Sequence, residues 1–241
     1  METGRAGIQT QAAGREIPDG ILEEYIPFWR ELTQSQQEKL KRASALETAQ
    51  KGVILHNGEE DCTGVLILIK GRARGYILSQ EGREITLYRL FPRDFCLFSA
   101  SCMLRGIEFE ISVLTEEETE FLHIPAEIYR SVMQESAAAS NYTNEVMSAR
   151  FSDVMWLLNQ VLYKKMDSRL AAFLLEESDL GEGNSLQITH EEIARHLGSA
   201  REVITRMLKY FQNEGLVKLT RGSVELLDEE ALGRIAGDSL R

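Results

Sequence analysis

Four polar side chains near the C-terminal end of the chain combine hydrogen-bond donors and acceptors within a short stretch. They are Arg201, Glu202, Thr205 and Arg206. An arginine can donate two hydrogen bonds to guanine O6 and N7, and a carboxylate can accept one from cytosine N4. A threonine hydroxyl can contact a base edge or a phosphate. The residue types therefore predict a surface that reads base pairs in the major groove of double-stranded DNA.

Two short helices joined through one glycine are predicted to position these side chains. Thr189–Glu192 has the Thr-x-x-Glu spacing of a capping box, and Gly198 ends the helix that follows. Ser199–Glu202 has the spacing of a second capping box, which is predicted to start the next helix. The apolar stripe of that helix consists of Val203, Ile204, Met207, Leu208 and Phe211. The pattern predicts a helix-turn-helix, and the apolar runs Val217–Thr220 and Val224–Leu227 predict a hairpin wing after it.

Several residues of this region have two interpretations. Glu202 either accepts from a cytosine or caps its own helix, because one carboxylate does not fully serve both roles. Four further residues are candidate phosphate contacts, the alternative for the charged ones being a solvated surface charge: Ser199, Lys209, Lys218 and Arg221.

The charge of the chain is unevenly distributed. The formal net charge is −11, which disfavours a nucleic-acid partner if it is averaged over the molecule. Residues 189–221, however, hold six basic and four acidic side chains. The acidity is concentrated elsewhere, so the charge permits DNA binding.

The rest of the chain predicts an α+β fold. Pro18–Gln50 has helical spacing of apolar residues, whereas Lys51–Ile124 consists of short apolar runs separated by glycines. The runs Val65–Ile69, Ala73–Leu78 and Glu84–Leu90 predict an antiparallel roll or sandwich.

A long helical region from Ala126 to about Glu177 follows, with apolar residues on two sides. A partner helix from a second subunit would cover them and make a homodimer, although packing within one chain remains the alternative. The expected organisation is a flexible arm, a β-roll domain with N-terminal helices, a dimerisation region and a winged helix-turn-helix domain. These occupy residues 1–16, 17–124, 125–166 and 167–241.

The chain resembles the Crp/Fnr superfamily of bacterial transcription regulators. The similarity is strongest over Ile188–Leu219, in the Thr-x-Glu-Glu-Ile-Ala segment, Gly198 and the stretch Arg201–Lys209. The resemblance implies a jelly-roll-like effector domain, a dimerisation helix and a C-terminal winged helix-turn-helix. It also implies a homodimer that reads an inverted repeat, with half-sites roughly 34 Å apart. RNA polymerase is a further expected partner if the protein activates transcription.

The resemblance does not identify the effector. Relatives that bind cyclic AMP hold its phosphate with an Arg-Ser pair, where this chain has Phe109 and Glu110. A carboxylate there repels a cyclic phosphate, so cyclic AMP is disfavoured. An iron–sulfur cluster is disfavoured because three cysteines are one short of four ligands and none precedes Cys62. Haem stays open, although the four histidines are dispersed, and no metal ligands are assigned. The candidate effector pocket consists of Cys96, Phe98, Ser99, Ser101, Cys102 and Phe109.

Cys96 and Cys102 allow two interpretations within this pocket. They are small buried apolar groups, which is the favoured reading, or they form a thiol-based redox or metal sensor.

Other classes of function lack sequence support. No dinucleotide fingerprint, P-loop, metalloprotease motif or nucleophile elbow is present, so the chain is not expected to be an enzyme. A cupin-like enzyme and a ligand-sensing protein that does not bind DNA are the disfavoured alternatives. No apolar run approaches the length of a membrane span, and the low cysteine count favours a cytoplasmic location.

Overall fold

The computed structural model describes residues 17–58, 62–103, 110–181 and 183–240, except the side chains of residues 101–103. The expected N-terminal arm, Phe109, and the side chains of Ser101 and Cys102 therefore lie outside the described residues. The chain divides into two compact units. The first comprises Met1–Ile77 and Leu87–Asp153, and the second comprises Leu78–Thr86 and Val154–Arg241.

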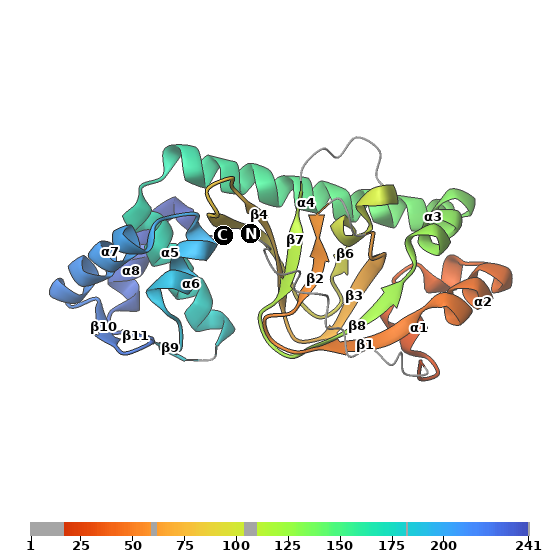
Figure 1. Ribbon diagram of the computed structural model, residues 1–241, viewed down its shortest axis with the longest axis horizontal. Coiled ribbons are helices and arrows are strands. Elements are labelled where there is room, and N and C mark those ends of the chain that lie inside the picture. Colours follow the sequence, from red (N-terminus) through yellow and green to blue (C-terminus); the bar gives the residue numbers. More distant parts are fainter. Residues whose placement is uncertain (1–16, 59–61, 104–109, 182, 241) are drawn as a thin grey trace, which may run out of the picture. The chain divides into compact units, whose positions relative to one another are not determined.

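The described residues between 45 and 124 form two four-stranded sheets with antiparallel pairing, and most of these strands belong to the first unit (Figure 1). One sheet has the order β1 (Ala45–Ala49), β8 (Thr119–Ile124), β3 (Val65–Lys70) and β6 (Phe95–Cys96). The other has the order β2 (Ile54–Asn57), β7 (Ser112–Thr115), β4 (Ala73–Leu78) and β5 (Glu84–Leu90). The bounds of β4 and β5 coincide with the predicted runs.

Strand β3 is buried on both faces. Val65 and Ile67 belong to the apolar cluster shared with the helices, and Leu66 and Leu68 belong to the cluster shared by the two sheets. All four side chains are 0% exposed. A strand covered on both sides has no polar face, which explains why its sequence is an unbroken apolar run.

Short helices cover the outer face of the sheet that contains β3. They are α1 (Ile21–Tyr25), the 3₁₀ turn η1 (Trp29–Glu31), α2 (Gln34–Ala43) and α3 (Ala126–Glu135). A further 3₁₀ segment, η3 (Phe98–Met103), follows β6.

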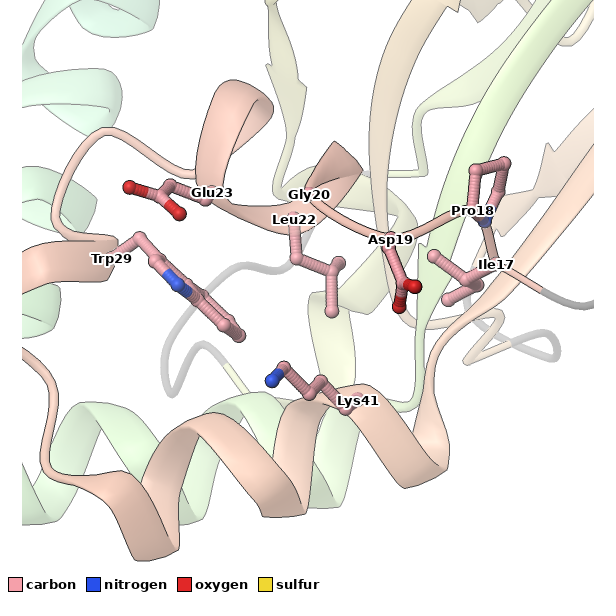
Figure 2. A pocket seen from close by; sticks show the side chains of 8 residues that line it. All are labelled: Ile17, Pro18, Asp19, Gly20, Leu22, Glu23, Trp29 and Lys41. Carbon is pink, nitrogen blue, oxygen red and sulfur yellow. The ribbon is translucent and has the colours of Figure 1, made fainter.

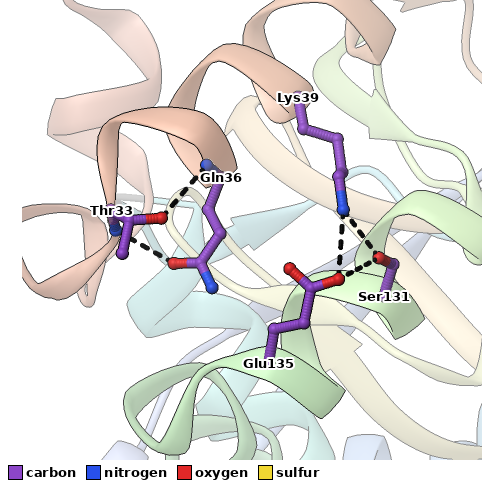
Figure 3. A network of polar contacts seen from close by, with 5 residues as sticks. All are labelled: Thr33, Gln36, Lys39, Ser131 and Glu135. Atoms are coloured by element: carbon purple, nitrogen blue, oxygen red, sulfur yellow. Dashed lines mark hydrogen bonds and ion pairs between the residues drawn. The ribbon is translucent and has the colours of Figure 1, made fainter.

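Helix α2 begins with a capping box, in which Thr33 and Gln36 each accept a backbone N–H of the other (Figure 3). The Lys39 ammonium then joins α2 to α3, because it donates to the Ser131 hydroxyl at 2.8 Å and pairs with the Glu135 carboxylate at 3.3 Å. The helical prediction to Gln50 is wrong for Ala45–Ala49, which form β1 because β8 lies beside them and satisfies their backbone groups.

The long helical region consists of three helices rather than one. Helix α3 is followed by α4 (Ala137–Tyr163) and α5 (Met166–Leu180). Ser136 separates the first two: its backbone is extended, and its hydroxyl accepts the Ala139 N–H at 3.3 Å as an N-cap does. Lys165 is also extended and precedes α5.

The second unit has its own apolar core. Besides α5 it contains β9 (Ser185–Leu186), α6 (His190–Leu197), α7 (Arg201–Asn213), β10 (Val217–Thr220), β11 (Ser223–Leu226), α8 (Glu229–Ala236) and the 3₁₀ turn η4 (Gly237–Ser239). The strands form one sheet in the order β10-β11-β9. Ile193, Leu208 and Phe211 are 0% exposed at the centre of this core.

Candidate nucleic-acid interface and effector region

Helix α6 begins and ends where the sequence predicts. Thr189 accepts the Glu192 N–H at 3.2 Å, and Glu192 accepts the Thr189 N–H at 2.7 Å, which completes the capping box. Gly198 ends the helix with φ 65°, a left-handed conformation that favours glycine. The α6 end is also held from α5, where the buried Arg169 guanidinium donates to the Leu197 carbonyl at 2.7 Å. A cation at a helix C-terminus is favourable.

The second predicted capping box does not form. The N-cap of α7 is Ala200, which has no side-chain hydrogen bond to the helix. Ser199 instead completes the end of α6, because its backbone N–H donates to the Ala194 carbonyl at 2.9 Å. Helix α7 thus starts one residue later than a Ser199 cap requires, and the capping role predicted for Glu202 is wrong.

Helix α7 separates apolar and polar side chains onto different faces. Ile204, Leu208 and Phe211 are 0% exposed in the core of the second unit. Its exposed side chains include Arg201, Glu202, Arg206 and Lys209. Thr205 is half-buried, and its hydroxyl lies 2.9 Å from His190 Nδ1. The predicted base-reading residues therefore occur together on one helix, with three of the four open to solvent.

The remaining phosphate candidates lie in the turn and the wing. Ser199 is half-buried between the two helices. Lys218 on β10 is exposed but pairs with Glu225 on β11 at 3.0 Å. Arg221 is exposed at the tip of the β10–β11 hairpin, beside Gly222 with its φ of 79°. Arg221 is thus better placed than Lys218 to give its charge to a phosphate.

The predicted effector residues that the structure describes are buried in the β-roll. Phe98 is 6% exposed and its ring lies 5.8 Å from that of Tyr88. Ser99 is fully buried, with its hydroxyl 2.7 Å from the Gly64 carbonyl oxygen and 2.8 Å from that of Cys96. Backbone groups thus satisfy this serine, which indicates a structural role.

Two residues of this region were not predicted from the sequence. The Tyr88 hydroxyl is buried and has no hydrogen-bond partner within the described residues. The Arg150 guanidinium of α4 lies 4.9 Å from the centre of the Tyr88 ring. Arg150 also pairs with Asp153 at 3.0 Å and Asp94 at 3.6 Å. Burial, and next the neighbouring Cys96 thiol, raise the pKa of Tyr88 well above its usual value, so the phenol stays neutral.

The cysteines differ from one another. Cys96 is a buried free thiol, and burial raises its pKa. Since the thiolate is the reactive form, this environment makes Cys96 a weak nucleophile. Cys62 is disulfide-bonded. Redox sensing through the Cys96 thiol therefore has little chemical support.

Known proteins match both parts of the chain. A cyclic nucleotide-binding domain model matches residues 46–136, and a Crp-like helix-turn-helix domain model matches residues 168–235. A crystal structure described as a transcriptional regulator of the Crp/Fnr family from Eubacterium rectale is 53% identical, with a TM-score of 0.87. It covers 88% of this chain and 99% of that one. The chain belongs to the Crp/Fnr family.

More distant Crp/Fnr relatives agree with this assignment. The cyclic AMP receptor protein of Thermus thermophilus is 28% identical over 170 residues, which are 70% of this chain and 78% of that protein. A CRP-family transcriptional regulator of the same organism shares the fold, with a TM-score of 0.67 at 22% identity over 81% of this chain and 98% of that one. The predicted fold class and the predicted class of function, a DNA-binding transcription regulator and not an enzyme, are thereby confirmed.

A cavity of about 190 Å³ opens beside α1, and Trp29, Lys41, Asp19 and Glu23 are among the residues that line it (Figure 2). The Lys41 ammonium lies 5.9 Å from the Trp29 ring, and the Asp19 and Glu23 side chains are exposed. None of the helices in the described ranges is both long enough and apolar enough to cross a membrane.

Proposed function

We propose that this Crp/Fnr regulator is a homodimer that binds an inverted-repeat operator by inserting α7 of each subunit into the major groove. The observation that carries the proposal is the polar face of α7, where Arg201, Glu202 and Arg206 are exposed on a helix whose other face is anchored in the core. A helix held in this way presents its N-terminal side chains at a fixed geometry.

Each side chain has a distinct role in this proposal. Arg201 and Arg206 donate to guanine O6 and N7, and Glu202 accepts from cytosine N4. Glu202 suits this role because its carboxylate does not cap α7. Thr205 contacts a base edge or a phosphate. Four residues contact the phosphate backbone and fix the register of the helix: Ser199, Lys209, Lys218 and Arg221.

Helix α4 supports the dimer. The described chain leaves large apolar side chains of this helix exposed: Phe151, Met155, Leu158, Val161, Leu162 and Tyr163. Residues 151, 155, 158 and 162 follow the heptad spacing of a helix that packs against a partner helix. A second α4 would cover this stripe. The expected half-site spacing is then one turn of DNA, roughly 34 Å.

The dimer is tested by sedimentation equilibrium of the Phe151→Glu and Leu158→Glu variants. Each places a charge on the stripe, so each is expected to dissociate the dimer. Ala149→Glu adds the same charge at an exposed position of α4 away from the stripe and should leave the dimer intact. A dimer that survives both stripe variants would contradict the proposal.

The reading face is tested with a duplex selected by the wild-type protein from a random-sequence pool. Arg206→Ala is expected to weaken binding to this duplex by roughly 1–3 kcal/mol in a gel-shift titration. Arg234→Ala removes an exposed arginine of α8 instead and should have little effect. Equal affinities of the two variants would show that α7 does not read the DNA.

We further propose that a small-molecule or redox signal acts at the β-roll and that cyclic AMP is not this signal. Glu110 supports the exclusion because a carboxylate repels a cyclic phosphate. The unbonded Tyr88 hydroxyl and the Arg150 guanidinium are the described groups best suited to contact a small polar effector. Tight binding of cyclic AMP in a calorimetric titration would contradict the exclusion. RNA polymerase is a partner in this scheme if the protein activates transcription.

A further inference from the structure

A histidine of α6 lies within hydrogen-bond distance of Thr205, one of the proposed base-reading residues of α7. His190 is the first residue of α6, and its Nδ1 lies 2.9 Å from the Thr205 hydroxyl oxygen. Both side chains are half-buried, so this contact is partly shielded from water but remains next to the exposed reading face. Since the hydrogen bond joins two helices, it fixes the rotamer of Thr205 as well as its hydrogen-bonding partner.

The direction of this hydrogen bond depends on the charge of the imidazole. A neutral histidine can present Nδ1 as an acceptor, in which case the Thr205 O–H donates to it and only the oxygen lone pairs face outward. A protonated histidine has N–H groups on both nitrogens and can only donate. The Thr205 hydroxyl proton is then free to donate to a phosphate oxygen, guanine N7 or O6, or thymine O4.

The charged groups around His190 influence its pKa, and so the pH at which the imidazole gains a proton. Burial lowers the pKa of His190, and Arg201 and then Lys209 of α7 lower it further. On α6 itself, Glu191 is exposed at 3.8 Å from Arg195, and the Glu192 carboxylate is held by Thr189. The free protein thus holds His190 neutral near pH 7. A DNA phosphate brought close to Arg201 and Lys209 would offset their charges and favour the protonated form.

We propose that His190 is a specificity-determining residue that sets whether Thr205 donates or accepts toward DNA and takes up a proton when DNA binds. The proposal rests on the proposed insertion of α7 into the major groove. It makes operator affinity depend on pH, with tighter binding at lower pH. By linkage, a rise of one unit in the pKa of His190 on binding corresponds to a roughly tenfold gain in affinity between the high-pH and low-pH limits.

The test measures the affinity for the selected duplex from pH 8.5 to pH 5.5 by fluorescence anisotropy at constant ionic strength. His190→Gln keeps a hydrogen-bonding amide that does not titrate, so it should bind like the wild type at pH 8.5 but lose the gain at low pH. His190→Ala removes the titrating group altogether, so it should also lose the gain at low pH. His196→Gln is the matched control: it removes an imidazole from the same helix, where the ring lies against Phe173 and Thr86, and should keep the wild-type slope.

Nuclear magnetic resonance of the imidazole protons gives a second readout that does not depend on affinity. The pKa of His190 should rise when the duplex is added, whereas that of His196 should change less. Parallel pH profiles of wild type and His190→Gln, or an unchanged His190 pKa in the bound state, would overturn the proposal. If Arg206→Ala also left the affinity unchanged, the insertion of α7 itself would be wrong.

Discussion

Helix α7, the proposed reading helix, and the proposed effector region of the β-roll use polar residues in opposite ways. On α7, Arg201, Glu202 and Arg206 are exposed and lie within one and a half turns of a single helix. In the β-roll, Tyr88, Cys96 and Ser99 are buried and come from separate segments of the chain. A surface that meets a large anionic partner needs accessible charge, whereas a site for a small effector must exclude water. Loss of an exposed α7 side chain is therefore expected to change binding with little change in stability, whereas the effect of losing a buried polar group depends on whether that group has a partner.

The largest expected effect concerns stability, and it distinguishes the buried face of α7 from its exposed face. Phe211→Ala removes a fully buried ring from the core of the second unit and should reduce the free energy of unfolding by roughly 3–5 kcal/mol. Arg206→Ala, on the exposed face, should change it by less than about 0.5 kcal/mol. Urea unfolding followed by circular dichroism measures both values. Similar losses for the two variants would show that the faces of α7 are not independent.

A smaller effect separates the two predicted capping boxes. Thr189→Ala should cost about 1 kcal/mol of stability because its side chain caps α6. Ser199→Ala should cost much less, since only the backbone of Ser199 takes part in the α6 end. Thermal unfolding of both variants provides the comparison, and an equal loss would mean that the Ser199 hydroxyl does cap α7 in solution.

In the β-roll, Tyr88→Phe should not lower the free energy of unfolding, in contrast to the substitutions in α6 and α7. The variant removes a buried hydroxyl that has no partner in the described residues, so stability should stay the same or rise by up to about 1 kcal/mol. The same variant should reduce the response of DNA binding to the effector if Tyr88 contacts it. A clear loss of stability in the effector-free protein would mean that the hydroxyl is already bonded.

The smallest expected effect is a pH dependence of the free energy of unfolding that arises from His123 in the β-roll. The hydrogen bond with Glu47 raises the pKa of His123 despite its partial burial, and the Thr63 carbonyl contributes to the rise. A raised pKa in the folded state means that protonated His123 stabilises the fold below its ordinary pKa of about 6.5. This stabilisation is lost as the pH rises from the ordinary pKa of histidine through the higher pKa of His123 in the folded protein. Unfolding curves between pH 5.5 and 8.5 should show a steeper decline for the wild type than for His123→Gln, and equal slopes would contradict the linkage.

Local sequence signals predicted the reading helix well. The Thr189 capping box, the left-handed Gly198 and the apolar stripe through Phe211 all depend on residues close together in the chain, so their spacing is sufficient. The same reasoning failed at Ser199, because the end of α6 competes for its backbone and shifts the start of α7. It also failed at Ala45–Ala49, where pairing with β8 outweighed the helical spacing.

Contacts between residues far apart in the chain could not be predicted from the sequence. Nothing in the spacing connects Tyr88 with Arg150, Arg169 with the Leu197 carbonyl, or His190 with Thr205. A local indication of the Tyr88–Arg150 contact was Arg150 itself. It is an arginine next to the apolar positions of α4, and Asp153 follows three residues later.

The class of this protein could be predicted from local sequence, because the residues of a helix-turn-helix are adjacent in the chain and the apolar period of each element is local. The tertiary structure decided which polar groups are free to act. It left Glu202 exposed on α7 without a capping role, bonded the Ser99 hydroxyl to backbone carbonyls and placed the Thr205 hydroxyl 2.9 Å from the His190 imidazole. The physical reason is that burial and hydrogen bonding depend on neighbours in space, which bring together segments that the order of residues keeps apart.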